Sequence, residues 1–204
     1  MNHQVINIAA WTVAVSAGLA AAGPTVIFHD NFDSENGGVG ELNYTGFANW
    51  TVSSGTVDLI GNGFHDFLPG NGLYVDLDGS SHDAGVLAQS TPMTFEAGKT
   101  YSLTFNLAGN QRGGQDSVHI SLGVGLLLSD VITLSSSDPF ELQTYTFVGD
   151  GTTGSIIFEN SGGDNVGALL DEVTMSIIPL PSAAGLAGLG LLALASGRRR
   201  VDLA

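Results

Sequence analysis

The chain has 204 residues, with 29 glycines, no cysteine and a formal net charge of −15. Such an acidic protein is a poor partner for nucleic acid or anionic lipid surfaces. The lack of cysteine excludes disulfides, thiol catalysis and cysteine-based zinc sites. Three of the five basic residues follow position 197, so the region 24–178 is more acidic still. This charge attracts cations such as Ca²⁺, although it also serves simply to keep an exported protein dispersed.

The first 22 residues predict a signal peptide with a signal helix. Val5 to Ala22 is almost wholly apolar, and Ala20 and Ala22 give the small-x-small pattern of a cleavage site. The segment has no Lys or Arg before its apolar run, so an uncleaved anchor is the alternative. Pro24 then begins an extended segment, as expected of a mature N-terminus.

Short β-rich segments alternate with Gly/Asn/Asp/Ser clusters throughout 24–176, and no window has sustained helical periodicity. In Thr100–Leu107 every second residue is apolar, and Ser117–Gly123 repeats this period of two. The pattern predicts an all-β fold, an antiparallel jelly-roll β-sandwich of about ten strands. Strands are expected at Thr25–His29, Phe47–Ser53, Thr56–Ile60, Leu73–Leu77, Gly85–Ser90, Thr100–Leu107, Ser117–Gly123, Val131–Leu134, Leu142–Val148, Ser155–Glu159 and Leu169–Ile177.

The C-terminal segment 178–204 predicts a short transmembrane helix. Its 16-residue apolar run, 182–197, ends at an arginine cluster. As a helix this run is ~24 Å long, less than the ~30 Å hydrocarbon core of a bilayer. The cluster indicates a cytoplasmic C-terminus, with the domain outside. An ordinary single-pass tail anchor is the alternative. The arginines are Arg198, Arg199 and Arg200.

This segment resembles the PEP-CTERM sorting signal in its Pro-Leu-Pro variant, because Pro179-Leu180-Pro181 precedes the apolar run and the arginines. The resemblance implies export by a Gram-negative bacterium and transient anchoring in the inner membrane. It also implies cleavage by an exosortase-type membrane protease and association with exopolysaccharide and biofilm, at the cell surface or in the extracellular matrix. Leu180 departs from the acidic middle residue of the commonest form, and 201–204 extend past the arginines.

Five blocks in the central region resemble the galactose-binding-like jelly rolls of the DUF642 and choice-of-anchor type. The resemblance implies the β-sandwich fold over 24–176, an architecture related to carbohydrate-binding modules, and a frequent structural Ca²⁺. It implies no defined sugar. The blocks are Asn49-Trp50-Thr51-Val52, Gly55-Thr56-Val57-Asp58-Leu59-Ile60, Tyr74-Val75-Asp76-Leu77-Asp78-Gly79, Tyr101-Ser102-Leu103-Thr104-Phe105-Asn106-Leu107-Ala108-Gly109-Asn110 and Leu169-Leu170-Asp171-Glu172-Val173.

Four carboxylates are candidate Ca²⁺ ligands: Asp33, Asp76, Asp78 and Asp171. Asp76 and Asp78 are two residues apart at the end of a strand, so both point to the same face. Asp33 follows the first strand and Asp171 lies on the last, and these strands usually lie near each other in a jelly roll. Carboxylate oxygens are the ligands that Ca²⁺ prefers. The alternative is that Asp78 merely forms a turn with Gly79.

Trp50, Tyr74, Asn110 and Arg112 are the candidate carbohydrate-binding residues. An aromatic ring covers the apolar face of a sugar, and amide or guanidinium groups bind its hydroxyls. The alternative places Trp50 and Tyr74 in the core and Asn110 in a turn.

No catalytic constellation is visible, and no enzymatic activity is predicted. Asp171 and Glu172 are adjacent, so on a strand they face opposite ways and cannot form a glycosidase pair. The histidines lack metal-protease spacing, and there is no G-x-S-x-G motif. The leading hypothesis is an exported protein that associates with polysaccharide. The alternatives are an envelope protein without sugar affinity and a polysaccharide-acting enzyme.

Overall fold

The computed structural model describes residues 22–123 and 127–179. The described residues from Gly23 onward form a compact unit with its own hydrophobic core. Its elements are β1 (Thr25–Asp30), η1 (Glu35–Gly38), β2 (Trp50–Ser54), β3 (Asp58–Gly61), β4 (Leu73–Asp76), β5 (Val86–Gln89), β6 (Met93–Thr94), β7 (Thr100–Ala108), β8 (Gln115–Leu122), β9 (Leu128–Ser135), β10 (Glu141–Val148), β11 (Thr153–Gly154), β12 (Ile156–Ser161) and β13 (Leu169–Ile178).

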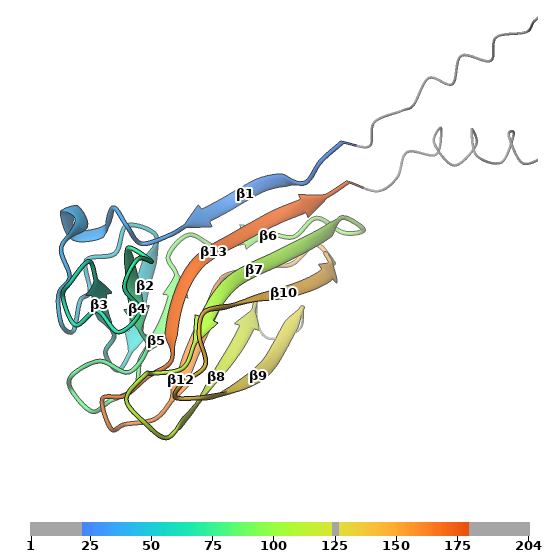
Figure 1. Cartoon of the computed structure of the whole chain (residues 1–204). Helices are drawn as coiled ribbons and strands as arrows, with labels where there is room; N and C mark the ends of the chain where they lie inside the picture. Colours follow the sequence, from blue (N-terminus) through green and yellow to red (C-terminus); the bar gives the residue numbers. More distant parts are fainter. Residues whose placement is uncertain (1–21, 124–126, 180–204) are drawn as a thin grey trace, which may run out of the picture. The chain divides into compact units, whose positions relative to one another are not determined.

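Two antiparallel sheets form the sandwich (Figure 1). The first sheet has the order β10-β7-β13-β4-β3, with β1 also paired to β13, and the second has the order β2-β5-β12-β8-β9. The short strands β6 and β11 form a separate pair. The first and last strands of the chain pair with each other, from Thr25↔Ile177 to Asp30↔Val173. The prediction of an all-β antiparallel sandwich is therefore confirmed.

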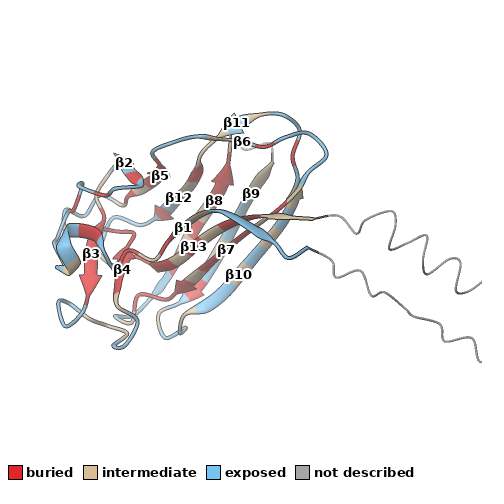
Figure 2. Ribbon diagram, turned by 90° about the horizontal axis from the view of Figure 1, so that it is seen from above, coloured by how far each residue is buried: buried red, intermediate tan, exposed pale blue. Residues whose placement is uncertain are grey.

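The core lies between the sheets and is built by the period-two pattern of the sequence (Figure 2). The four inward side chains of β7 are at most 1% exposed, and Val118, Ile120 and Leu122 of β8 are fully buried. Phe105 packs edge-on against Phe158 of the opposite sheet, with ring centroids 5.0 Å apart. A smaller cluster of Ile60, Tyr74, Ala108 and Leu169 lies apart from this core. We call the face of the first sheet that points away from the main core its outer face.

Each of the eleven predicted strands corresponds to an observed strand, although the ends shift by up to three residues. The two-residue strands β6 and β11 and the helix η1 were not predicted, because they are too short to show a period. The predicted signal helix, the apolar helix, the arginines, Leu180 and Pro181 lie outside the described residues, whereas Pro179 is the last residue described. No helix within 22–123 and 127–179 is long and apolar enough to cross a membrane.

Candidate functional site

A pocket on the outer face begins with the pairing of β3 and β4. Asp58 opposes Asp76 and Ile60 opposes Tyr74 in this antiparallel pair. Alternate residues of both strands, such as Leu59 and Val75, belong to the main core. The period of two therefore places Asp58 and Asp76 together on the outer face.

The loop between β3 and β4 forms one wall of this pocket, and the Tyr74 hydroxyl holds it in place. The N–H groups of Phe67 and Leu68 donate to that hydroxyl at 2.7 and 2.9 Å. The hydroxyl in turn donates to Asp66 Oδ1 at 3.0 Å. Burial raises the pKa of Tyr74 to about 12, so the hydroxyl keeps its proton and this network stays intact at physiological pH.

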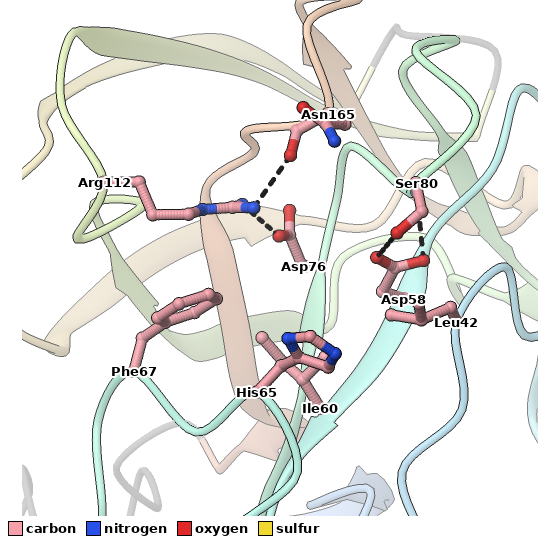
Figure 3. A pocket seen from close by; sticks show the side chains of 9 residues that line it. All are labelled: Leu42, Asp58, Ile60, His65, Phe67, Asp76, Ser80, Arg112 and Asn165. Atoms are coloured by element: carbon pink, nitrogen blue, oxygen red, sulfur yellow. Dashed lines mark hydrogen bonds and ion pairs between the residues drawn. The ribbon is translucent and has the colours of Figure 1, made fainter.

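Arg112 comes from the loop between β7 and β8 and forms another wall. Its guanidinium donates to Asp76 Oδ2 and, at 2.8 Å, to the backbone carbonyl of Asn165 (Figure 3). It also lies 4.8 Å from the centroid of the Phe67 ring. One cation thus joins three separate segments of the chain around the pocket.

Nine residues line the resulting cavity, whose volume is about 130 Å³. It combines an apolar side with carboxylate, guanidinium, imidazole, hydroxyl and amide groups. We call it the outer-face pocket (Figure 3). Its lining residues are Leu42, Asp58, Ile60, His65, Phe67, Asp76, Ser80, Arg112 and Asn165.

The carboxylates of this pocket are buried but well supplied with donors. Asp76 Oδ1 accepts the N–H groups of Asp78 and Gly167 at 3.1 and 3.0 Å. A Cβ at Gly167 would lie 2.6 Å from that oxygen, so the close approach requires glycine. Burial raises the pKa of Asp76 to about 7, and the opposing charge of Arg112 limits the rise. Asp58 accepts the hydroxyl of Ser80 at 2.8 Å.

Of the four predicted carbohydrate-binding residues, only Arg112 lines the pocket. The prediction for Trp50 and Tyr74 as sugar platforms is wrong, because their rings are at most 2% exposed. The Trp50 indole N–H donates to Asp30 Oδ2 at 3.0 Å, which allows the ring to be buried. Asn110 is also buried, and it organises its own turn by bonding Gly113 and Asp116.

The four predicted metal ligands do not come together as one cluster. Asp76 belongs to the outer-face pocket, and Asp78 is buried beside it, with its Oδ2 bound by the N–H of Gly163 at 2.8 Å. Asp78 Oδ1 is buried without a hydrogen-bond partner in the described part of the chain. Asp33 and Asp171 form a second group. Within the described ranges, no three His, Cys, Asp or Glu side chains are placed to hold a metal ion.

In that second group, the ionised form of the Asp171 carboxylate is disfavoured. Burial raises its pKa to about 7, and the negative charges of Glu172, Asp33 and Asp30 add to the rise. Among the described residues, the basic side chain that pairs with one of these acids is His29, whose Nε2 lies 3.9 Å from Glu172 Oε2. Glu172 itself has a φ of 54°, at the bulge where β13 shifts register against β7. The neighbouring Asp30 and Asp33 accept hydrogen bonds from the Trp50 indole N–H and the Leu73 N–H, respectively.

Sequence reasoning missed most of the pocket residues, among them Asp58, His65, Phe67 and Asn165. Asp58 was not predicted because its position opposite Asp76 depends on the strand register, which cannot be read from the sequence. The other three lie on loops. His65 and Asn165 both have positive φ, 45° and 59°, and for histidine this is a strained conformation.

The fold and pocket define an antiparallel β-sandwich with a small polar pocket on one sheet face. The family model for "Protein of unknown function (DUF642)" matches residues 32–176. The chain therefore belongs to the DUF642 family, which confirms that part of the predicted resemblance.

A curated relative and several solved structures are also similar to this chain. Halomucin of Haloquadratum walsbyi is 31% identical over an alignment of 191 residues, and the match covers 84% of this chain but only 2% of that protein's length. The CBM22-1 xylan-binding domain from Paenibacillus barcinonensis has 10% identity and a TM-score of 0.49, covering 79% of this chain and 100% of that one. A carbohydrate-binding module of a Cellvibrio mixtus lichenase has 13% identity and a TM-score of 0.41, covering 74% and 98%.

Proposed function

We propose that this protein is an exported, non-catalytic carbohydrate-binding protein, and that the outer-face pocket holds one sugar ring. The observation that supports the proposal is the combination of Phe67 and Ile60 on one side with fixed polar groups on the other. Sugar recognition needs an apolar surface for the ring and polar groups for its hydroxyls.

The size and charge of the pocket narrow the expected ligand. A cavity of about 150 Å³ holds benzene, which has half the heavy atoms of a hexose, so the 130 Å³ here encloses the inserted part of one sugar ring, at a chain end or branch. Asp58 and Asp76 outnumber Arg112, and the whole chain carries −15. Neutral or amine-bearing sugars are therefore expected to bind better than uronic acids.

Glycan-array binding followed by calorimetry tests this proposal. Phe67→Ala and Asp58→Asn are each expected to weaken binding about tenfold or more, roughly 1.4 kcal/mol. Glu159→Gln, at an exposed position of β12 in the other sheet, is the matched control and should bind as the native protein does. Absence of binding to acidic, neutral and amine-bearing glycans refutes the proposal, as does binding that both pocket variants retain.

We also propose that Ca²⁺ binds beside Asp171 as a structural ion, with Asp33 and Asp30 nearby. The support is the raised pKa of Asp171 and the repulsion among these acids. The bound cation would supply the positive charge that this group lacks, and Asp171 would then remain ionised. Thermal unfolding with Ca²⁺ and with EDTA tests this. An unchanged melting temperature contradicts it.

Export and processing complete the proposal. Residues 1–22 direct secretion, and 178–204 act as a PEP-CTERM-type signal that an exosortase-type protease cuts near Pro179. Release into an exopolysaccharide matrix fits a sugar-binding domain. Mass spectrometry of the native protein shows whether both ends are removed. Replacing Arg198–Arg200 should mis-sort the protein while 24–178 remains folded, and normal sorting of that variant contradicts this step.

A further inference from the structure

Strand β10 forms an edge of the first sheet that the described part of the chain leaves without a partner. Exposed edges present unpaired N–H and C=O groups, and proteins usually blunt them with charges, bulges, short strands or covering segments. β10 is eight residues long, and it pairs with β7 in continuous register from Glu141 to Val148. Glu141, at its first position, is the only charged residue in the strand.

The other sheet edges do carry such protection. At β3, Leu59 exchanges backbone hydrogen bonds with Glu41 at 2.8 and 2.9 Å, so the 41–44 segment covers that edge. Edge strand β2 has five residues and a register shift. Edge strand β9 carries Asp130, whose carboxylate accepts the neighbouring Val131 N–H at 2.9 Å. Edge strand β1 has a register shift between Val26 and Phe28. Among the described edges, β10 is thus the eight-residue strand with neither a bulge nor an interior charge, whereas the equally long β9 carries Asp130.

The side chains of β10 are also complementary to themselves. Leu142, Thr144, Thr146 and Val148 alternate along the exposed outer face, with Leu142 65% and Val148 58% exposed. An antiparallel pairing of two copies centred on Tyr145 places Leu142 of each copy against Val148 of the other. It places Thr144 against Thr146, and Glu141 against the partner's Gly149 rather than another acid. Centring the pairing on Thr144 keeps the ladder equally long but sets Leu142 against Thr146, and centring it on Thr146 shortens the ladder and sets Leu142 against Asp150.

We propose that β10 pairs antiparallel with β10 of a second copy, so that the two first sheets join into one continuous sheet. The interface is isologous, as expected of a two-fold dimer, because the same strand contributes both halves. The association is expected to tighten as salt is raised, because each chain carries a formal charge of −15 and salt screens the repulsion.

This dimer leaves the outer-face pocket free, since β3 and β4 lie at the opposite end of the sheet order from β10. A two-fold axis perpendicular to the sheet puts both outer faces on the same side. If the proposed function holds, the dimer presents two sugar sites to one polysaccharide and gains avidity. The pairing itself does not depend on sugar binding.

Sedimentation equilibrium of the full chain, with Val148→Lys and Val131→Lys as a matched pair, tests the pairing. Both valines are 58% exposed, but Val131 lies on β9 in the other sheet. Val148→Lys is expected to raise the dimer dissociation constant about tenfold or more, because the change acts twice in a two-fold dimer. Val131→Lys should leave it unchanged. Both changes reduce the net negative charge by the same amount. If only Val148→Lys weakens dimerisation, the effect therefore cannot come from the overall charge.

Cysteine cross-linking tests the register. The native chain has no cysteine, so a Thr144→Cys chain and a Thr146→Cys chain each carry a single thiol. Oxidation of their mixture is expected to give the mixed disulfide in preference to either homodimer, because residue 144 faces residue 146. Absence of dimers at high salt, an equal effect of the two lysine variants, or no preference for the mixed disulfide each overturns the proposal.

Discussion

Replacing Arg112 with alanine should destabilise the domain strongly, and by an amount that depends on pH. The side chain of Asp76 is 2% exposed and that of Arg112 is 26% exposed. Breaking a buried ion pair by removing one partner costs about 3–5 kcal/mol. The partial exposure of Arg112 and the two N–H groups that still bind Asp76 reduce this, so we expect about 2–3 kcal/mol at pH 8.

The cost should fall at lower pH because Asp76 then takes up a proton. Its pKa is already raised to about 7, and loss of Arg112 raises it further. At pH 5 the carboxyl of the variant is neutral, and the remaining cost is the lost bond to Asn165 and the contact with Phe67, about 1 kcal/mol. Stability of the variant relative to the native protein therefore improves as pH falls from 8 to 5.

Urea unfolding at pH 5 and pH 8, followed by tryptophan fluorescence, measures these differences. Lys99→Ala is the control, because Lys99 forms an exposed ion pair with Glu96 at 2.7 Å, and its removal should change the stability little at either pH. Adding Asp76→Asn to Arg112→Ala should restore part of the stability at pH 8. An equal cost at both pH values, or no rescue by the second change, refutes the reasoning.

Three further results are expected. Tyr74→Phe should cost about 1–2 kcal/mol in urea unfolding and weaken sugar binding, because two loop N–H groups lose their acceptor; unchanged binding contradicts the role of Tyr74 in positioning the loop. In EDTA, the free energy of unfolding should fall from pH 5 to pH 8, since the pKa of Asp171 is raised and its proton is lost over this range; Ca²⁺ should flatten that slope, and Asp171→Asn should reduce it to the part that Asp76 contributes. Gly167→Ala should destabilise the domain by about 1–3 kcal/mol, because its Cβ would lie 2.2 Å from the Asp78 nitrogen; a stability equal to the native value contradicts the crowded geometry.

The strands could be predicted from the sequence because the core imposes a strict alternation on them. On β7, Tyr101, Leu103, Phe105 and Leu107 are all buried, while the residues between them are only partly so. Burial on one face determines that pattern whatever the strand's neighbours are. The fold class also predicted that the first and last strands lie near each other, and β1 and β13 do so by pairing directly.

The pocket could not be predicted in the same way, because it depends on strand register and loop conformation. Nothing in the sequence states that Asp58 opposes Asp76, or that the Tyr74 hydroxyl holds the loop with Phe67. Trp50 is an error of the opposite kind, because the sequence predicted a binding residue where the structure has a core residue. Aromatic residues with a polar atom are good sugar platforms, but Asp30 satisfies the indole N–H inside the protein, and the ring is then free to fill the core.

The outer-face pocket contains several features that do not favour the stability of the fold. A buried ion pair such as Arg112–Asp76 can often be replaced by apolar residues with no loss of stability. Directly opposed carboxylates, here Asp58 and Asp76, repel each other. A left-handed backbone at a non-glycine residue such as His65 costs on the order of 1 kcal/mol. Natural proteins keep such local conflicts mainly where function requires them, and three of them meet here around a single cavity. Their coincidence supports our proposal that a ligand binds in this pocket rather than at the aromatic core residues.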